Sequence, residues 1–272
     1  MPNAEVLSWV RSRFMPHIWC PGCGHGVIMH AIIRALIGIG ADRKNTVLAS
    51  GIGCSSRMAG YINACTLHST HGRSLAFSTG IKLHRPDLTV VNVMGDGDCT
   101  AIGGNHFIHA CRRNIDITAI VMNNNIYGMT GGQASPTTPV GAFATTTPYG
   151  AVDPTFDICK LAEGAGASYV ARTTIANPKQ AETFIANGIR KKGFSVIEVV
   201  THCHTQFGRK NNRRLPIENY KYFKENSIPL ALAKDKSPEE LADKIVCGEF
   251  VNKDTPEYTE QYQKLVIDKA RG

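Results

Sequence analysis

The 272-residue chain lacks several features that would place it in common protein classes. Its most apolar early stretch, residues 27–39, is interrupted by His30 and Arg34 and is too short to span a bilayer. The first 14 residues include two arginines but no continuous apolar run of the kind found in signal peptides. No internal repeat or low-complexity tract is present. We therefore expect a cytoplasmic protein that does not enter a membrane.

A second Cys-x-x-Cys pair is also missing, although the chain has nine cysteines. The single pair, Cys20 and Cys23, follows an irregular segment, whereas a redox dithiol normally follows a strand. A zinc ribbon needs a second pair, and ferredoxin-type clusters need a Cys-x-x-Cys-x-x-Cys run. Disulfides are rare in the cytosol, so metal or redox chemistry is favoured. Half of an iron–sulfur site and half of a zinc site both remain open.

The formal net charge of +8 raises the possibility of nucleic-acid binding. Much of the excess is local, however, in one cluster at residues 209–214 (RKNNRR) and another at Lys191 and Lys192. Clusters of this size are usually solvated loops, so we expect no nucleic-acid partner. An acidic protein partner or an anionic cofactor would use the same charge.

Short β-branched runs alternate with amphipathic segments, a pattern typical of a parallel α/β sheet. The chain is 43% hydrophobic, enough for a substantial core. The mostly apolar run at 88–94 indicates a strand covered on both faces, so we expect a doubly wound, mostly parallel sheet. The predicted strands are 46–50, 88–94, 116–122, 168–171 and 195–201, and the predicted helices are 26–36, 73–84, 101–113, 155–165 and 179–192.

Two segments depart from this alternation. Residues 128–150 (GMTGGQASPTTPVGAFATTTPYG) have no period, and a long irregular segment inside a compact domain is more often functional than idle. After Cys203 the chain becomes charged, with a helical pattern. The sequence thus predicts a main domain at 1–203 and a helical C-terminal extension at 204–272 that is available to contact a partner.

Polar side chains follow two neighbouring predicted strands at the point where each strand ends. Gly95-Asp96-Gly97-Asp98 follows one strand, and residues 123–125 (NNN) follow the next. In a parallel sheet both turns emerge at the carboxyl edge, where α/β folds bind ligands. Glycines and helix N-termini suit a phosphate, and carboxylate and amide oxygens suit Mg²⁺.

This spacing resembles that of thiamine-diphosphate enzymes. The resemblance implies a thiamine-diphosphate-binding (PP-type) domain in which the side chains of Asp96 and Asn124 and the carbonyl of Ile126 bind Mg²⁺. It also implies that four residues line the diphosphate, namely Gly97, Asp98, Gly128 and Met129.

Among the single cysteines, Cys54 and Cys203 each follow a predicted strand end, and those ends should lie at the same edge of the sheet as Asp96. The others are expected to be structural: Cys65, Cys111, Cys159 and Cys247 fall within or beside helical patterns as small core residues, and Cys99 lies nearer the site.

The strings CPGCGHG, SGIGCSSR, LHSTHGR, GDGDCTAIGGNH and NNNIYGMTGGQASPTTP resemble the β subunit of 2-oxoacid:ferredoxin oxidoreductases, most closely the 2-oxoglutarate group. The resemblance runs from about residue 14 to about residue 225. It implies one [4Fe–4S] cluster bound by Cys20, Cys23, Cys54 and Cys203. It also implies thiamine contacts from Ile52, Gly53, Cys54, Ser55 and His71. The string Thr201-His202-Cys203-His204 departs from the proline-containing context expected around the fourth cysteine.

The implied activity is oxidative decarboxylation of a 2-oxoacid, with coenzyme A accepting the acyl group and ferredoxin the electrons. The expected substrate is 2-oxoglutarate, giving succinyl-CoA. Alternatives are a pyruvate or branched-chain 2-oxoacid enzyme, a non-redox thiamine decarboxylase subunit, and a zinc-bearing nucleic-acid-binding protein. The cysteine quartet argues against the decarboxylase, and the magnesium motif against the zinc protein.

Two further residues are candidates for roles in catalysis. Arg57, three residues after Cys54, is predicted to hold a substrate carboxylate through paired hydrogen bonds, although a structural salt bridge is equally compatible. His71 is predicted to contact the diphosphate or exchange protons.

Thiamine enzymes activate their cofactor with a glutamate from a pyrimidine-binding domain, and this chain shows no second set of strand–helix units that would form one. The resemblance therefore implies an α subunit carrying that domain, together with small ferredoxin-like subunits for any further clusters.

Overall fold

The computed structural model describes residues 3–271 and is built on an eight-stranded sheet in the order β2-β1-β3-β4-β8-β7-β10-β9. The strands from β2 to β7 in this order run parallel, and β10 lies antiparallel to β7. This arrangement confirms the predicted mostly parallel sheet. The strands are β1 (Thr46–Ser50), β2 (Cys65–His68), β3 (Thr89–Gly95), β4 (Thr118–Asn123), β7 (Tyr169–Thr174), β8 (Ser195–Val200), β9 (Ser227–Pro229) and β10 (Ile245–Asn252), and β5 (Ile126–Tyr127) pairs with β6 (Gln133–Ala134) separately.

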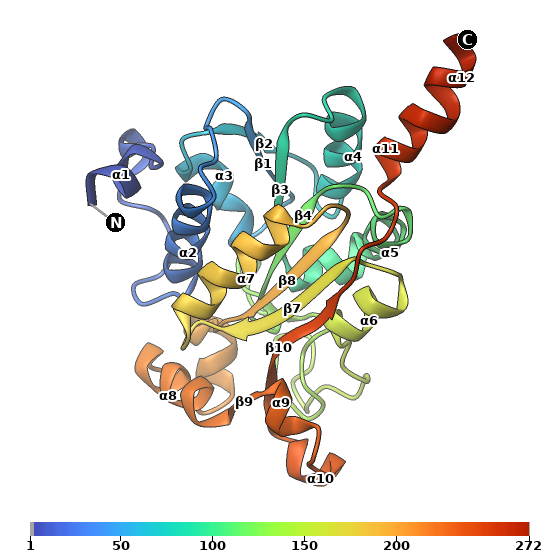
Figure 1. Cartoon of the computed structure of the whole chain (residues 1–272). Helices are drawn as coiled ribbons and strands as arrows, with labels where there is room; N and C mark the ends of the chain where they lie inside the picture. The colour runs from blue at the N-terminus through green and yellow to red at the C-terminus, as the bar shows by residue number, and fades with distance from the viewer. Residues whose placement is uncertain (1–2, 272) are drawn as a thin grey trace.

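Helices cover both faces of the sheet, as expected for a doubly wound fold (Figure 1). On one face, α2 (His25–Gly38) packs beside α7 (Pro178–Arg190). The other face is covered by α4 (Ser74–His84), α5 (Gly104–Arg113) and α6 (Ile158–Gly164). All five helices were predicted from the sequence, with ends that differ by a few residues.

The central strands are buried on both faces, and alternate side chains enter different cores. Val91 and Val93 of β3 join the core under α2 and α7, whereas Val90 and Met94 join the core under α4, α5 and α6. Each fully buried aliphatic side chain contributes about 1.5–3 kcal/mol. Burial of these apolar runs therefore strongly favours a position for these strands at the centre of the sheet.

The C-terminal tail contains two strands that were missed in the sequence. The predicted helical character is present, but β10 pairs with β7 and extends the sheet, and β9 pairs with β10. The reason is that β10 reads IVCGEFVN, in which a glycine and a glutamate interrupt the apolar run. The tail helices are α8 (Pro216–Asn226), α9 (Leu230–Ala233), α10 (Pro238–Leu241), α11 (Tyr258–Tyr262), the π-helical η5 (Gln263–Ile267) and α12 (Asp268–Arg271).

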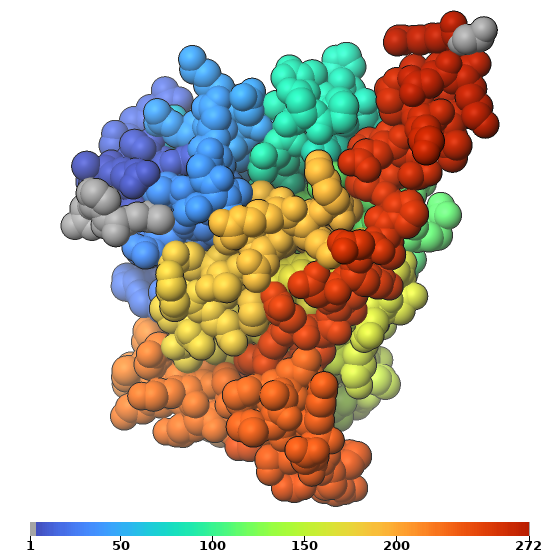
Figure 2. Space-filling model, viewed as in Figure 1, coloured from blue at the N-terminus to red at the C-terminus, as the bar shows by residue number. Residues whose placement is uncertain are grey.

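The continuous helical segment from α11 through η5 to α12 projects from the body of the protein (Figure 2). Its base is attached by Glu257, whose carboxylate accepts hydrogen bonds from the backbone N–H groups of Asp116 and Glu260. The tail is therefore joined to the main sheet rather than forming a separate helical unit. Whether residues 204–272 contact a partner remains a prediction.

Two cysteines that were expected within or beside helices lie in strands instead. Cys65 is in β2 and is exposed rather than a core residue, whereas Cys247 is buried in β10. Cys99, Cys111 and Cys159 are buried, as expected for structural cysteines.

The remaining elements are short, and three of them, η2, η3 and η4, follow the carboxyl ends of β1, β3 and β8. They are α1 (Asn3–Ser8), η1 (Ser12–Phe14), η2 (Ser55–Arg57), α3 (Met58–Tyr61), η3 (Asp98–Ile102) and η4 (His204–Gly208). Within residues 3–271, no helix combines the length and apolar character required to cross a membrane.

Candidate functional site

A cavity of about 160 Å³ lies at the carboxyl edge, where the loops after β1, β3 and β4 meet. Every residue for which the sequence predicted a thiamine or magnesium contact lines it: Ile52, Gly53, Cys54, Ser55, His71, Asp96, Gly97, Asp98, Asn124, Ile126, Gly128 and Met129. Arg57 does not line this cavity, and its side chain is exposed on the surface. The parallel topology thus brings together residues separated by more than 70 positions in the chain.

Three oxygen atoms converge on one side of this cavity. The Asn124 side-chain oxygen lies 3.3 Å from Asp96 Oδ1 and 2.7 Å from the Ile126 carbonyl oxygen. With the Asn124 amide turned over, its nitrogen would donate hydrogen bonds to both atoms, as a protein without a cation would favour. With the oxygen facing inward, the three atoms form a set of hard ligands. This donor set fits Mg²⁺.

The Asp96 carboxylate is buried and is held from its other side. Its Oδ2 accepts hydrogen bonds from Ser135 Oγ at 2.5 Å and Thr137 Oγ1 at 2.7 Å. Burial nevertheless raises the pKa of Asp96. A cation at Oδ1 would oppose this shift and favour the ionised form.

Ser135 and Thr137 were not selected in the sequence analysis. They lie in the irregular segment at 128–150, and the motif NNNIYGMTGGQASPTTP contains both. The motif could therefore have indicated that these two residues are part of the site. However, a serine or threonine in a loop gives no indication of which carboxylate it will contact. Only the folding of this segment over β3 and β4 brings the two hydroxyls to Asp96.

Asp98 connects two loops at the base of the cavity. Its Oδ1 accepts hydrogen bonds from the backbone N–H of Gly72 at 2.7 Å and of Ile52 at 3.3 Å, and it lies 2.6 Å from His71 Nδ1. Burial raises the pKa of Asp98, while these contacts oppose the shift. Asp98 and His71 therefore help to shape the loops that line the cavity, in addition to facing it.

Gly97 allows the turn after β3 to pass close to Tyr127. A Cβ atom at this position would lie 2.2 Å from Tyr127 Cε1, far inside contact distance. The Tyr127 hydroxyl donates a hydrogen bond to the Gly97 carbonyl at 3.3 Å. The Gly-Asp-Gly motif thus meets a steric requirement here and leaves the backbone of the turn open to a ligand.

Four cysteines surround a second cavity of about 290 Å³ beside the first. They are the predicted ligands Cys20, Cys23, Cys54 and Cys203. Burial raises the pKa of Cys23 to about 12 and that of Cys54 to about 11, so without a metal these groups are thiols. Four cysteines on one cavity fit a [4Fe–4S] cluster, which would bind them as thiolates and displace their protons.

Several contacts shape the cysteine cavity. Trp19 Nε1 donates a hydrogen bond to the Cys54 carbonyl at 2.6 Å, and His202 Nε2 lies 3.0 Å from the Gly22 carbonyl, where it supports the loop between Cys20 and Cys23. The unexpected His202 next to Cys203 therefore has a structural contact. Gly128 lines both cavities, and a Cβ there would lie 3.2 Å from Cys203 Sγ.

Comparison with known proteins gives matches along almost the whole chain. The family model for the thiamine pyrophosphate enzyme C-terminal TPP binding domain matches residues 51–199. The 2-oxoglutarate synthase subunit KorB of Methanocaldococcus jannaschii is 55% identical over 261 residues, covering 96% of this chain and 97% of that protein. The KorB subunit of Archaeoglobus fulgidus is 49% identical over 270 residues, covering 99% and 97%.

A solved structure is also similar. It is the 2-oxoglutarate:ferredoxin oxidoreductase from Magnetococcus marinus with 2-oxoglutarate, coenzyme A and succinyl-CoA bound. It is 30% identical in sequence with a TM-score of 0.86, and the match covers 99% of this chain and 92% of that one.

Proposed function

The chain belongs to the thiamine pyrophosphate enzymes and, among them, to the KorB-type β subunits of 2-oxoacid:ferredoxin oxidoreductases, and on this basis we propose that it acts within a 2-oxoglutarate:ferredoxin oxidoreductase. The reaction converts 2-oxoglutarate and coenzyme A to succinyl-CoA and CO₂, and the electrons pass to ferredoxin. The observation that supports this proposal most directly is the contact between the two cavities. They share His25, Cys54, Asn124, Gly128 and Met129, so a thiamine site and a cluster site are direct neighbours.

Each cavity has a role in this proposal. Asp96, Asn124 and the Ile126 carbonyl would hold Mg²⁺ for the diphosphate, and the four cysteines would hold the [4Fe–4S] cluster. When bound, thiamine diphosphate would supply the electron sink for decarboxylation and the cluster a one-electron acceptor. Gly97 and Gly128 line the first cavity with backbone that no side chain covers.

The chain supplies part of the active site. No glutamate lines the first cavity in the part of the chain that the structure describes. This supports an α subunit whose pyrimidine-binding domain provides the activating glutamate. Coenzyme A and ferredoxin are the further partners of the proposed reaction, and small ferredoxin-like subunits remain a prediction.

The proposal is tested by anaerobic co-expression with the α subunit. Coenzyme-A-dependent reduction of a viologen is measured with 2-oxoglutarate, pyruvate and a branched-chain 2-oxoacid. We expect the highest kcat/KM with 2-oxoglutarate. CO₂ release without viologen reduction, in a preparation that contains no iron, would instead identify a non-redox decarboxylase.

The role of Arg57 remains a prediction with a separate test. Because the Arg57 side chain is exposed and does not line the cavity, a substrate carboxylate would have to be bound at the mouth of the site. If it is bound there, Arg57→Met is expected to raise the KM for 2-oxoglutarate about tenfold or more and to leave the KM for pyruvate nearly unchanged. Equal changes for both acids would show that Arg57 does not select the substrate.

Basic side chains adjoin the exposed side of the cysteine cavity. Thr205 contacts both Cys20 and Cys203, at 3.9 Å and 3.5 Å between its Oγ1 and the two Sγ atoms. Thr205 also lines an open groove together with Arg209 and Arg214. Cys20 is exposed, so the cluster site is closest to solvent on this side. An acidic electron-carrier protein fits this groove through charge complementarity.

Reversal of these charges is expected to weaken carrier binding. In Arg209→Glu/Arg214→Glu, the KM for ferredoxin should rise on the order of tenfold at low ionic strength, because steering by surface charge is lost. Turnover with a small viologen should be unchanged. Lys253→Glu, which alters an exposed lysine beyond β10, is the control. If the double variant has the same KM for ferredoxin as the unsubstituted enzyme, the carrier binds at another surface.

A further inference from the structure

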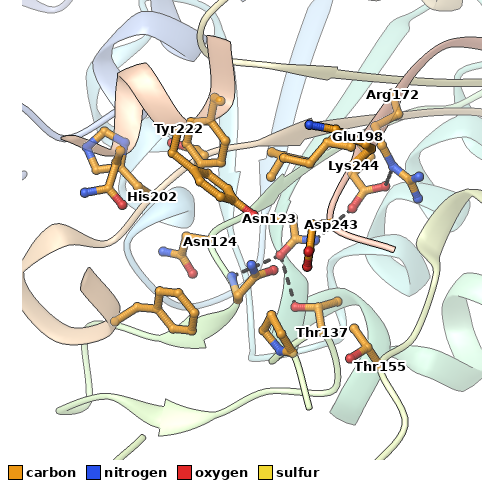
Figure 3. A pocket seen from close by; sticks show the side chains of 18 of the residues that line it. Asn123, Asn124, Thr137, Thr155, Arg172, Glu198, His202, Tyr222, Asp243 and Lys244 are labelled. Carbon is orange, nitrogen blue, oxygen red and sulfur yellow. Dashed lines mark hydrogen bonds and ion pairs between the residues drawn. The ribbon is translucent and has the colours of Figure 1, made fainter. Parts of the chain in front are cut away.

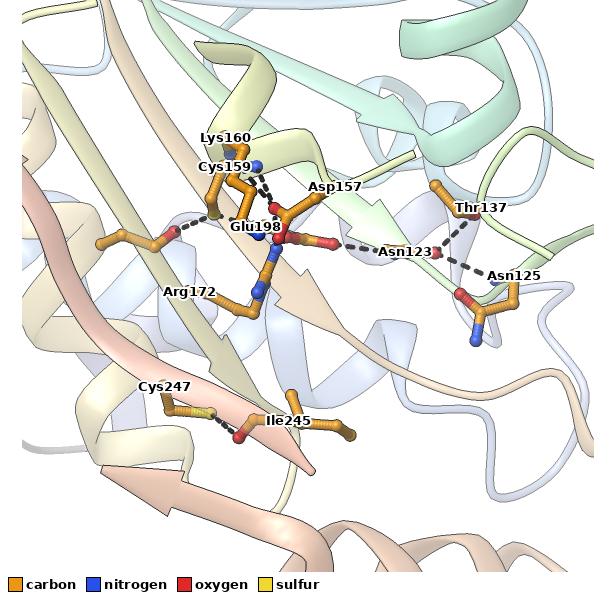
Figure 4. Close-up of polar contacts among 11 residues, drawn as sticks. Asn123, Asn125, Thr137, Asp157, Cys159, Lys160, Arg172, Glu198, Ile245 and Cys247 are labelled. Carbon is orange, nitrogen blue, oxygen red and sulfur yellow. Dashed lines mark hydrogen bonds and ion pairs between the residues drawn. The ribbon is translucent and has the colours of Figure 1, made fainter. Parts of the chain in front are cut away.

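A row of mostly buried polar side chains crosses the sheet between Arg172 and Thr137 (Figure 4). Its first members are Arg172 on β7, Glu198 on β8 and Asn123 at the end of β4, three strands that are adjacent in the sheet. Arg172 is directly opposite Glu198 in the register, and its Nε lies 2.6 Å from Glu198 Oε2. Asn123 Nδ2 donates a hydrogen bond of 2.8 Å to Glu198 Oε1. The row thus crosses directly from β7 to β8 and then diagonally to β4, where Asn123 lies two residues beyond the position opposite Glu198.

Thr137 connects this row to the carboxylate of Asp96. Its Oγ1 lies 3.0 Å from Asn123 Oδ1 and 2.7 Å from Asp96 Oδ2. A hydroxyl has a single proton to donate. Asn123 Oδ1 already accepts a hydrogen bond from the Asn125 N–H at 3.0 Å, and a bond to a carboxylate is the stronger of the two alternatives. The Thr137 hydroxyl therefore lies between two acceptors, and its proton is directed mainly at Asp96 Oδ2 and shared with Asn123 Oδ1 as a three-centre hydrogen bond.

Glu198 is unusual for a central strand. It is 2% exposed and lies in the otherwise apolar or small-residue run SVIEVV of β8. A buried ion pair is weak evidence for stability, because an apolar residue could replace it at little cost in free energy. Here Arg172 forms ion pairs with both Glu198 and Asp157, so its positive charge balances the buried carboxylate of Glu198. The arrangement suits a positioning role better than a purely stabilising one.

The same groups do not form a second metal site. Ligand atoms of Asp157, Cys159 and Glu198 lie within 4.8 Å of one another. However, the guanidinium group of Arg172 bonds to both carboxylates and provides the positive charge that an ion would supply. The cluster is therefore a hydrogen-bonded ion-pair network.

We infer that Arg172, Glu198, Asn123 and Thr137 are positioning residues for the magnesium site. Ionised Glu198 can only accept hydrogen bonds, so it selects the orientation of Asn123 in which the amide oxygen faces Thr137 and Asn125. Thr137 then fixes Asp96 Oδ2, which leaves Oδ1 facing the oxygens of Asn124 and Ile126. The inference rests on the proposed function, since it requires that Asp96 binds Mg²⁺.

The surroundings of the row permit conservative substitutions. A cavity of about 460 Å³ runs along it, and Asn123, Thr137, Arg172 and Glu198 all contribute to its wall (Figure 3). Side chains of unchanged shape can therefore be introduced at Thr137 and Glu198 without crowding the core. Glu198→Gln also leaves Arg172 paired with Asp157.

The test measures the Mg²⁺ concentration that half-saturates thiamine diphosphate binding to the cofactor-free complex with the α subunit, by calorimetry. In Thr137→Val it should rise about 10- to 100-fold, the usual effect of losing a partner that orients a metal ligand, and in Glu198→Gln about tenfold. Thr137→Ser, which restores the hydroxyl, should return to within about threefold of the original value. Cys159→Ala removes a 3.4 Å contact to Glu198 that is not part of the row and should have no effect.

The possible results are distinguishable. An unchanged Mg²⁺ requirement in Thr137→Val and Glu198→Gln, even with a lower Tm, would overturn the inference, because the row would then serve stability alone. Equal losses in Thr137→Ser and Thr137→Val would overturn it as well. If the unsubstituted complex binds thiamine diphosphate without any Mg²⁺ requirement, the proposed function itself fails.

Discussion

Asp96→Asn is expected to abolish Mg²⁺-dependent thiamine diphosphate binding at ordinary concentrations. Asp96 Oδ1 is the one charged atom of the three converging oxygens, and the substitution replaces it with a neutral group of the same shape. Loss of one partner from a buried, hydrogen-bonded charge pair costs about 2–5 kcal/mol. That corresponds to a decrease in affinity of roughly 30- to several-thousand-fold. Calorimetry with Mg²⁺ and thiamine diphosphate measures the change directly.

The fold should tolerate this substitution. Burial raises the pKa of Asp96, so a neutral amide removes an unfavourable buried charge and can still accept hydrogen bonds from Ser135 and Thr137. We therefore expect a Tm for the cofactor-free protein that is equal or higher. Asp87→Asn, at an exposed aspartate paired with Arg85, is the matched control and should bind cofactor normally. Normal binding by Asp96→Asn would remove Asp96 from the metal site.

Cys203→Ser is expected to remove the iron–sulfur cluster and leave thiamine diphosphate binding in place. Cys203 lines the cysteine cavity but not the first cavity, whereas Cys54 lines both. The substitution therefore separates the two sites. A [4Fe–4S] cluster needs a ligand for each iron, and a serine oxygen is a poor replacement for a thiolate. Iron content, visible absorption and ferredoxin reduction should all fall to background.

The measurements must be made anaerobically, with Cys65→Ser as the control. Cys65 is an exposed cysteine on β2 and does not line either cavity, so its loss should not affect the cluster. Full iron content in Cys203→Ser would show that Cys203 is not a ligand. Simultaneous loss of iron and of thiamine diphosphate binding would show instead that the cluster holds the first cavity open.

The centre of the fold could be predicted from the sequence because its strands are dense apolar runs. Strand β1 begins and ends at the predicted residues, and β3, β4, β7 and β8 differ from prediction by a few residues. Edge strands are specified less strongly, since one side of such a strand makes no sheet contact. For this reason the edge strands β2 and β9 were missed. Strand β10 lies between β7 and β9 and was missed because a glycine and a glutamate interrupt its apolar run.

The proximity of the candidate-site residues could also be predicted from the sequence, and the reason is topological. When every strand of a sheet runs parallel, the turns that follow the strands must meet at one edge. Gly95–Asp96, Asn124, Cys54 and Cys203 all follow strand ends, so their proximity is a consequence of the strand order. Arg57 is three residues beyond such a turn, and the local helix η2 directs its side chain away from the cavity.

The sequence by itself determined the fold class, the loops that carry the chemistry and the residue types available to a metal and a cluster. The tertiary structure alone decided the lateral contacts: Ser135 and Thr137 on Asp96, Arg172 beside Glu198, and Glu198 beside Asn123. The physical reason is the direction of the interactions. Apolar periodicity and turn motifs can be recognised from residues that are close together in the sequence. Hydrogen bonds between neighbouring strands depend instead on strand register and on how the loops fold back, and local sequence encodes neither of these.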